Sequence, residues 1–432
     1  MKAVRLGLIG FGTVGKGVVR NIMANGELMA ARTGIRLEIA RIADIDLKRE
    51  RDVQVDPALL TTDAREILQD DSLDIVVELI GGIHPAREYV LTALRKGKHV
   101  VTANKALLSE HGREIFETAR EHGVDVLYEG SVAGCIPVIK SLRESLVANN
   151  ILSIDGIVNG TCNYVLTRMQ QDRMSFSGAL DEAKGKGYAE ADPSFDVNGT
   201  DSAQKLAILA SLASDSWVEV DNIYVEGIAN ITQKDIAYAS ELGYVVKLLA
   251  IAKFGSDWVQ ARVHPALMPR DHPLADVWGV HNAVYIVGDY AGEIMLYGAG
   301  AGERPASSAV VGDIMEISRN IKSAAKKRIS SLPVAAAPKR QVPINEIEAR
   351  YYLRFTVIDK PGVLAQITTV LGANEISISA VTQKERHPKN AVPVVVMTHA
   401  AKEESVQAAL KTVDSLDVVK DRTVMIRIEE GA

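Results

Sequence analysis

The chain has 432 residues, of which 47% are hydrophobic and 24% are charged, and its formal net charge is −6. This length predicts about two or three globular domains. The acidic balance argues against a nucleic acid as the main partner, because phosphate binding needs a concentrated basic surface. No apolar run reaches the ~18 residues of a membrane-spanning helix, and the N-terminus lacks the layout of a signal peptide. We therefore expect neither a nucleic acid nor a membrane as a partner.

The first 150 residues alternate short apolar runs with segments of helical periodicity. The apolar runs, which we expect to be strands, span residues 4–10, 37–43, 74–80, 98–103 and 124–130. Helices are predicted between them, among others at residues 86–96 and 105–122. Continuous apolar strands separated by helices are typical of a parallel sheet that is covered on both faces.

A glycine-rich motif follows the first predicted strand and opens a helix. It is the G-x-G-x-x-G pattern formed by Gly10, Phe11, Gly12, Thr13, Val14 and Gly15. The first glycine permits the tight turn, the second lets the backbone approach a pyrophosphate, and the third lets the helix pack closely on the strand. Helix N–H groups would then hold the phosphates. We predict an α/β Rossmann-type dinucleotide-binding domain over residues 1–150, completed by a helix at about residues 304–328.

The end of the second predicted strand bears on the choice of cofactor. A carboxylate there accepts from a ribose 2′-hydroxyl, as in NAD, whereas a cation favours the 2′-phosphate of NADP. Asp44 favours NAD, while Lys48 and Arg49 keep NADP open. The pattern leans towards NAD.

Residues 151–303 mix helices and strands and predict a second, α+β domain. Helices are expected at residues 203–213 and 232–254, and strands in AVYIVGDY and EIMLYGAG. Residues 331–348 contain several prolines and read as a linker.

The last part, residues 349–432, follows a β-α-β-β-α-β order. The predicted elements are strand 351–358, helix 362–371, strands 377–381 and 392–398, helix 405–415 and strand 423–428. This order is typical of a ferredoxin-like unit.

An acidic stretch, GYAEADPSFDVNGTDSAQK, covers residues 187–205. Its carboxylates could belong to a solvated loop, a cation site or the wall of a pocket for a cationic substrate. Asp201 and Lys205 are spaced i,i+4 and share a face if the segment is helical. They could also form an ordinary surface ion pair, worth about 0.3–0.5 kcal/mol. Asp192 and Asp196 read as turn residues around Pro193, and we assign them no direct role.

Several segments together resemble the homoserine dehydrogenases over essentially the whole chain. They are GLIGFGTVG, VVTANKALL, YEGSVAGCIPVI, NGTCNYVLTRM, GYAEADPSFDVNGTDSAQKLAIL and GAGAGERPASSAV. The tail, with DKPGVLAQITTVL, resembles an ACT domain, a regulatory module that often binds amino acids. The resemblance implies an NAD(P)-dependent oxidoreductase that interconverts L-homoserine and L-aspartate 4-semialdehyde, on the route to threonine and methionine. It makes residues 151–303 the catalytic, substrate-binding and dimerisation domain.

Oxidising an alcohol requires a hydride acceptor and a base for the hydroxyl proton. Lys205 is the first candidate for the base, with Lys105 beside it. An ordinary lysine has a pKa of about 10.4, and burial or a second ammonium lowers such a pKa. Two lysines that face one pocket would therefore supply an acid/base. Their proximity is a hypothesis, since they lie far apart in the sequence.

The resemblance also implies binding residues for the substrate and the cofactor. Substrate contacts would come from Glu190 and Asp201, from Thr161 and the amides near Gly160, and from Tyr188 in the pocket wall. Beyond the glycine-rich motif and Asp44, the cofactor contacts would come from Thr102, Lys105 and Gly302.

A further implied site is a monovalent cation, sodium, near residues 129–136. Its ligands would be the Glu129 side chain and the carbonyls of Val132, Gly134 and Ile136. A glutamate in a tight loop suits a hard cation. The alternative is that Glu129 accepts hydrogen bonds from local amides.

In the tail, the Asp359–Gly362 turn opens a helix. ACT domains hold an amino acid between this loop and the facing strand of paired modules. The implied contacts are Asp359, Gly362, Val363, Leu364, Ile376 and Ile378. Threonine feedback in a homodimer or homotetramer is the hypothesis, and a dimerisation module without a ligand is the alternative.

Two other functions stay open. A nucleotide-binding sensor would not need the set Lys105, Glu190, Asp201 and Lys205. Another dehydrogenase acting on aspartate semialdehyde would be marked by Cys135 as a thiol nucleophile. The chain has two cysteines, too few for a disulfide framework, so reduced thiols and a cytoplasmic location are expected.

Overall fold

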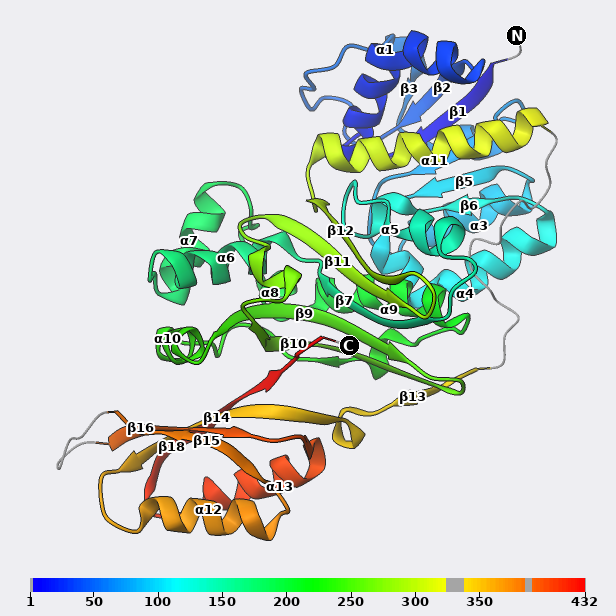
Figure 1. Ribbon diagram of the computed structural model, residues 1–432. Coiled ribbons are helices and arrows are strands. Elements are labelled where there is room, and N and C mark those ends of the chain that lie inside the picture. The colour runs from blue at the N-terminus through cyan, green and yellow to red at the C-terminus, as the bar shows by residue number, and fades with distance from the viewer. Residues whose placement is uncertain (1–2, 324–337, 385–390, 432) are drawn as a thin grey trace.

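A computed structural model describes residues 3–323, 338–384 and 391–431 of the chain. The described strands form two sheets, one of six strands and one of twelve. In Figure 1 the six-stranded sheet and its helices form the upper part of the molecule, and the twelve-stranded sheet continues from the middle into the lower part.

The six-stranded sheet is parallel throughout, with the order β3-β2-β1-β4-β5-β6. Its strands are β1 (Val4–Ile9), β2 (Leu37–Ala43), β3 (Leu60–Thr61), β4 (Ile75–Glu78), β5 (His99–Thr102) and β6 (Val126–Leu127). The helices of this part are α1 (Thr13–Thr33), α2 (Ala64–Gln69), α3 (Ala86–Arg95), α4 (Lys105–His122) and the short α5 (Val138–Lys140). The predicted Rossmann-type sheet is confirmed. Its strand order reverses between β1 and β4, where such sheets bind ligands at the carboxyl ends of the strands.

Helix α11 (Glu303–Ser323) returns from the second part to this sheet and lies along α1 (Figure 1). Gly17 on α1 leaves no room for a side chain, because a Cβ there would lie 3.0 Å from the carbonyl of Glu303 and the Cβ of Ser307. Val310 and Ile314 are buried in the core beneath α11. The predicted extension of this helix through residue 328 lies outside the described residues.

The first strands of the large sheet have the order β12-β11-β7-β9-β10. They are β7 (Ile151–Ile157), β9 (Tyr244–Phe254), β10 (Trp258–Pro269), β11 (His281–Gly288) and β12 (Gly292–Ala299), with the short β8 (Tyr224–Val225) beside β10. The helices are α6 (Gly160–Gln171), α7 (Phe176–Gly185), α8 (Ser194–Val197), α9 (Thr200–Ser214) and α10 (Gln233–Glu241).

The predicted helix over residues 232–254 is wrong in its second half. Helix α10 ends at Glu241, Gly243 takes a left-handed conformation with φ +88°, and β9 follows. This strand pairs on both sides and is buried along most of its length. A strand buried on both faces shows no alternation, so its apolar run resembles a buried helix.

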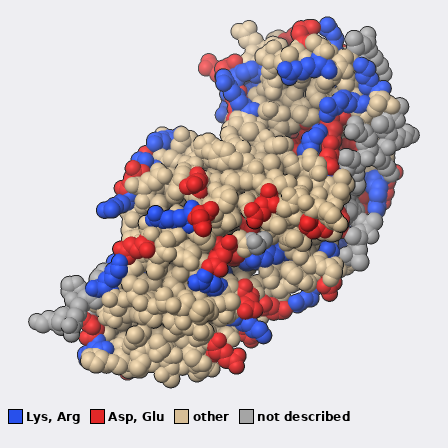
Figure 2. Space-filling model, in the orientation of Figure 1, with Lys and Arg blue, Asp and Glu red and all other residues tan. Residues whose placement is uncertain are grey.

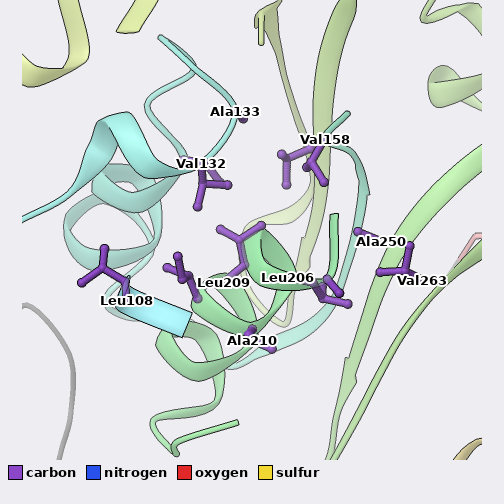
Figure 3. Close-up of a cluster of buried hydrophobic side chains, with 14 of the residues drawn as sticks. Leu108, Val132, Ala133, Val158, Leu206, Leu209, Ala210, Ala250 and Val263 are labelled. Carbon is purple, nitrogen blue, oxygen red and sulfur yellow. The ribbon is translucent and has the colours of Figure 1, made fainter. Parts of the chain in front are cut away.

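A hydrophobic core fixes α9 between helix α4 and the large sheet (Figure 3). Leu206, Leu209 and Ala210 belong to α9. They share this core with Leu108 of α4, Val132, Ala133, Val158, Ala250 of β9 and Val263 of β10. Burying one leucine contributes about 1.5–3 kcal/mol, so the position of α9 is well determined. The same helix carries Asp201 and Lys205.

The C-terminal part has the predicted β-α-β-β-α-β order, and the ferredoxin-like prediction is confirmed. Its elements are β14 (Glu348–Ile358), α12 (Val363–Ala373), β15 (Ile378–Thr382), β16 (Ala391–Thr398), α13 (Glu403–Val413) and β18 (Val419–Ile428), with the short β17 (Ala401–Lys402). Strand β18 pairs in parallel with β10, so this part continues the large sheet. Residues 331–337 of the predicted linker lie outside the described residues, whereas β13 (Arg340–Val342) pairs with β10.

Ion pairs join the C-terminal part to α10, to the segment after β8 and to β10. They link Arg354 to Asp235 (2.6 Å), Arg427 to Glu226 (3.0 Å) and Glu429 to Arg262 (2.7 Å). Burial raises the pKa of Glu429, but the positive charges facing it from β10 and β9 outweigh burial and hold that pKa at about 2. Removing one partner of such a buried pair costs about 3–5 kcal/mol.

Acidic and basic side chains are interspersed on the face of the molecule in Figure 2, without one large basic patch there. Among the described helices, none combines the length and the apolar character required to span a bilayer.

Candidate active site

Two glycines of the G-x-G-x-x-G motif are required by packing, and one is open. Gly10 has φ +105°, and a Cβ on Gly15 would lie 2.1 Å from the Gly10 carbonyl oxygen. Gly12 has no atom within 4 Å of the position of a Cβ, and it precedes α1. On the first turn of α1, Thr13 is exposed and Val14 is partly buried, and the Phe11 ring before them is buried. The arrangement leaves N–H groups of α1 available for a phosphate.

A pocket of about 460 Å³ lies beside this loop, lined in part by Gly12, Asp44, Arg49 and Arg51. Asp44 accepts a hydrogen bond from the Phe11 N–H (2.6 Å) and lies 3.4 Å from the Arg51 guanidinium. Arg51 was not anticipated from the sequence. It places a positive charge beside the carboxylate that favours NAD.

The ends of β4 and β5 meet at the same edge of the sheet. Glu78 is fully buried and accepts hydrogen bonds from the Thr102 hydroxyl (2.7 Å) and the Ile80 N–H (2.9 Å). Burial raises the pKa of the Glu78 carboxyl. Sequence reasoning named Thr102 and missed Glu78, although a glutamate that ends an apolar strand at the switch point is a visible signal.

Lys105, Asp201 and Lys205 meet in one cluster. Lys105 opens α4, while Asp201 and Lys205 lie in successive turns of α9. The Asp201 carboxylate is 2.6 Å from Lys205 Nζ and 3.3 Å from Lys105 Nζ. Its side chain is 6% exposed, against 13% for Lys205 and 31% for Lys105. Burial raises the pKa of Asp201, but the two ammonium groups outweigh burial, so this pKa lies below its usual value. One ionised carboxylate therefore holds both lysines.

Asn159 organises this cluster. Its Nδ2 donates to Asp201 (2.8 Å) and to Asp196 (2.7 Å), and its Oδ1 caps α6 by accepting from the Cys162 N–H (2.8 Å). Burial raises the pKa of Asp196. Asp196, read from the sequence as a turn residue, is therefore part of the same hydrogen-bond network. Asn159 was missed, and the only local signal for it is an asparagine before a helix.

The other predicted substrate residues differ in burial and in contacts. Thr161 is buried and donates to the Tyr188 carbonyl (2.7 Å), and Tyr188 is 44% exposed. A Cβ on Gly160 would lie 2.7 Å from the Val280 carbonyl oxygen, so glycine is required there. Glu190 is exposed, and among the described contacts it forms no ion pair with the lysines.

Three comparisons with known proteins identify the family. The homoserine dehydrogenase NAD-binding domain matches residues 10–129, the homoserine dehydrogenase domain matches residues 137–315, and an ACT domain matches residues 351–418. A homoserine dehydrogenase of Pseudomonas aeruginosa is 43% identical over 100% of both chains. The chain belongs to the homoserine dehydrogenase family.

Solved homoserine dehydrogenases agree with this assignment. A structure from Thiobacillus denitrificans superposes with a TM-score of 0.93 at 41% identity, over 100% of this chain and 99% of that one. A hyperthermophilic archaeal homoserine dehydrogenase in complex with NADPH has a TM-score of 0.62 at 27% identity and covers 73% of this chain and 98% of its own. The chain is thus an NAD(P)-dependent oxidoreductase, and the sensor alternative is not supported.

In this homoserine dehydrogenase, Glu129 accepts hydrogen bonds from the N–H groups of Ile139 (2.9 Å) and Lys140 (2.8 Å). Burial raises the pKa of Glu129 to about 7. A Cβ on Gly134 would lie 2.6 Å from the Ala299 carbonyl oxygen, so this loop packs against the segment that leads to Gly302 and α11. These contacts match the alternative prediction, in which Glu129 accepts hydrogen bonds from local backbone amides. Among the described residues, no three His, Cys, Asp or Glu side chains converge as metal ligands.

The predicted regulatory residues of the ACT domain divide into two groups. Gly362 and Leu364 are exposed, and Asp359 and Ile378 are partly buried. Val363 and Ile376 are buried in the core of the domain. Their side chains therefore stabilise the loop from within.

Proposed function

We propose that this homoserine dehydrogenase interconverts L-homoserine and L-aspartate 4-semialdehyde at the cluster of Lys105, Asp201 and Lys205, on the route to threonine and methionine. The observation that carries the proposal is the shared carboxylate. Through Asp201, a lysine at the carboxyl end of the dinucleotide-binding sheet meets a lysine of the second part. A substrate between them would lie beside the cofactor crevice.

The chemistry is a balanced transfer of one hydride and one proton. When bound, the nicotinamide supplies the hydride donor or acceptor. In the direction of reduction, the Lys205 ammonium gives its proton to the aldehyde oxygen as the hydride reaches the carbon. Two of its three N–H groups are directed at Asp201 and the Val158 carbonyl oxygen (2.7 Å), which leaves one for the substrate. Oxidation of homoserine is the reverse, and Lys105 orients the same oxygen.

Replacing Lys205 tests this assignment. Lys205→Ala is expected to lower kcat at least roughly 10²-fold, while the Kd for NAD(P)H, measured by fluorescence titration, stays nearly unchanged. Lys184→Ala, on α7, is the control and is expected to keep wild-type turnover. Normal turnover in Lys205→Ala would remove that residue from the mechanism.

Substrate recognition is proposed to use Glu190, Thr161, Tyr188 and the amides near Gly160 together with Asp201. Homoserine carries an ammonium and a carboxylate, and the exposed carboxylate of Glu190 suits the ammonium. Glu190→Gln is expected to raise the KM for homoserine while the cofactor Kd stays unchanged. Unchanged KM would exclude Glu190 from the site.

For the cofactor, we propose a preference for NAD, based on Asp44 at the end of β2. Arg49 and Arg51 line the same pocket and suit the 2′-phosphate of NADP. Initial rates with both cofactors measure the preference. A higher kcat/KM with NADP than with NAD would contradict the proposed preference for NAD.

Sodium is proposed to bind between Glu129 and the carbonyls of Val132, Gly134 and Ile136. The buried carboxylate supports a cation there. The expected result is a higher Tm in sodium chloride than in choline chloride, lost in Glu129→Gln. Equal wild-type Tm values in sodium chloride and choline chloride would contradict the proposed sodium site.

Regulation by threonine is proposed at the ACT loop around Gly362, in a homodimer or homotetramer. We also propose the functional division into residues 1–150, 151–303, 331–348 and 349–432. Equilibrium dialysis of the full chain with threonine tests the effector. The absence of threonine binding at millimolar concentration would exclude threonine as the effector.

A further inference from the structure

Lys247 is a buried lysine that the proposed reaction does not use. It lies on β9, between β7 and β10, and is 1% exposed. Among the described contacts, its ammonium meets a carbonyl oxygen, a side-chain amide and an aromatic ring, and it forms no ion pair. Burial lowers the pKa of Lys247 to about 7, although the charge of Asp276 acts in the opposite direction. A lysine that only fills space extends its ammonium into water, so an ammonium held inside the protein without a carboxylate indicates a specific role for its contacts.

These contacts join the loop before β11 to helix α6. Residues 277–281, which we call the 277–281 segment, end with the first residue of β11. Lys247 Nζ donates to the Val277 carbonyl oxygen of this segment and lies 3.8 Å from the centre of the Trp278 ring. It also donates to Asn163 Oδ1 on α6 (3.4 Å). The ammonium therefore attaches both the segment and the helix to β9.

The 277–281 segment also contacts α6 directly. Asn163 Nδ2 donates to the His281 carbonyl oxygen (3.1 Å). A Cβ on Gly160 would lie 2.7 Å from the Val280 carbonyl oxygen, so no space separates the segment from the first residue of α6. Because protein interiors are close-packed, a shift of the segment is passed on to the start of this helix.

The start of α6 belongs to the proposed substrate site. Asn159, its cap residue, donates to Asp201 (2.8 Å). The cap satisfies the N–H of Cys162, whereas the N–H groups of Gly160 and Thr161 have no acceptor among the described hydrogen bonds. Two free N–H groups at the positive end of a helix suit a carboxylate, and homoserine carries one.

We propose that Lys247 is a positioning residue for substrate binding, which holds the 277–281 segment and thereby keeps the Gly160 and Thr161 N–H groups in place for the substrate carboxylate. The inference rests on the proposed function and deepens it, because Lys247 is not among the residues proposed above to contact homoserine. If Lys247 loses its charge, the buried Val277 carbonyl oxygen loses this donor and the segment loses its attachment to β9. The effect is expected at the carboxylate end of the substrate and not at the cofactor, whose glycine-rich loop lies between β1 and α1.

Two compounds that each lack one group of homoserine test the proposal on the full chain. L-2-Aminobutyrate keeps the carboxylate and lacks the hydroxyl, whereas 3-amino-1-propanol keeps the hydroxyl and lacks the carboxylate. Calorimetry with the cofactor bound measures the Kd of each. Lys247→Met is expected to weaken L-2-aminobutyrate at least about tenfold, the effect of one hydrogen bond to a charged group. The Kd of 3-amino-1-propanol and the cofactor Kd from fluorescence titration are expected to stay unchanged. Lys253→Met, on the same strand and 36% exposed, is the matched control and is expected to keep all the wild-type values.

Equal weakening of both compounds would indicate a general loss of structure and overturn the proposal, and so would unchanged Kd values or no binding of L-2-aminobutyrate to the wild type. If Lys247→Met does not fold, Trp278→Leu keeps the lysine and removes the ring beside it. This variant is expected to weaken L-2-aminobutyrate alone, at least about threefold, and the same outcomes overturn the proposal. Calorimetry needs no turnover, so a failure of this inference is distinguishable from a failure of the proposed reaction, which would show as no homoserine oxidation by the wild-type chain.

Discussion

Replacing Asp201 by asparagine removes the charge that holds the two lysines and keeps the shape of the side chain. At an effective dielectric constant of about 20, the gross attraction is about 6 kcal/mol at the 2.6 Å distance to Lys205 and about 5 kcal/mol at the 3.3 Å distance to Lys105. Desolvation offsets most of this attraction, and loss of one partner of a buried pair costs about 3–5 kcal/mol. Because the Lys105 side chain is 31% exposed, solvent weakens its attraction to Asp201.

We therefore expect Asp201→Asn to lower the free energy of unfolding by about 3 kcal/mol, at the low end of that range, because the amide oxygen still accepts from Lys205. Turnover falls at least roughly 10²-fold, since both ammonium groups lose their common anchor. Urea unfolding and NAD(P)H absorbance with homoserine measure the two effects. Asp192→Asn, in the exposed loop before α8, is the control. An Asp201→Asn variant as stable and as active as this control would refute the reasoning.

Three further predictions follow from the geometry. Gly15→Ala is expected to lower Tm, because its Cβ would lie 2.1 Å from the Gly10 carbonyl oxygen. Gly12→Ala is expected to keep the wild-type Tm and to lose cofactor affinity in fluorescence titration. Equal Tm values and equal cofactor affinities in the two variants would contradict the prediction. Asn159→Ala is expected to lower kcat about tenfold, which is the effect of one hydrogen bond to a charged group, and to leave the cofactor Kd unchanged. Asn159→Asp keeps the oxygen that caps α6 and removes the amide N–H groups, so it shows whether the hydrogen bond to Asp201 is needed. Glu429→Gln is expected to cost about 3 kcal/mol near neutral pH, because the folded pKa of Glu429 is about 2 and its usual value is 4.5. This contribution is present above pH ~4.5 and is lost as the pH falls towards ~2, so the gap between wild type and variant in urea unfolding must narrow from pH 6 to pH 3; a constant gap rules out the charge as its cause.

Local features of the sequence predicted what depends on local packing. The glycines of the dinucleotide loop follow a buried strand directly, and both the turn and the helix start are set within a few residues. Buried parallel strands are likewise apolar along their whole length, which makes them visible. The same property caused the error at β9, where an apolar run after α10 read as more helix, and only Gly243 marked the change.

The cluster of Lys105, Asp201 and Lys205 shows where sequence reasoning stops. Lys105 lies on α4 and Lys205 on α9, in different parts of the chain, and nothing in the spacing around either lysine reveals the other. Asn159 and Asp196 join the hydrogen-bond network of Asp201 only because α6, α8 and α9 converge. Their residue types alone did not predict these contacts. Glu190, singled out by the resemblance, is exposed and forms no ion pair with either lysine among the described contacts. Long-range convergence is a property of the packed core, which no short pattern encodes.

The position of Asp201 connects these points. The core around Leu206 and Leu209 determines where α9 lies, and the ion pair with Lys105 joins that helix to the dinucleotide-binding sheet. A shift of α9 would therefore change the distance between Lys105 and Lys205. Helix α9 is thus the element on which the proposed acid/base depends, because the core that buries its leucines also holds Asp201 between the two lysines.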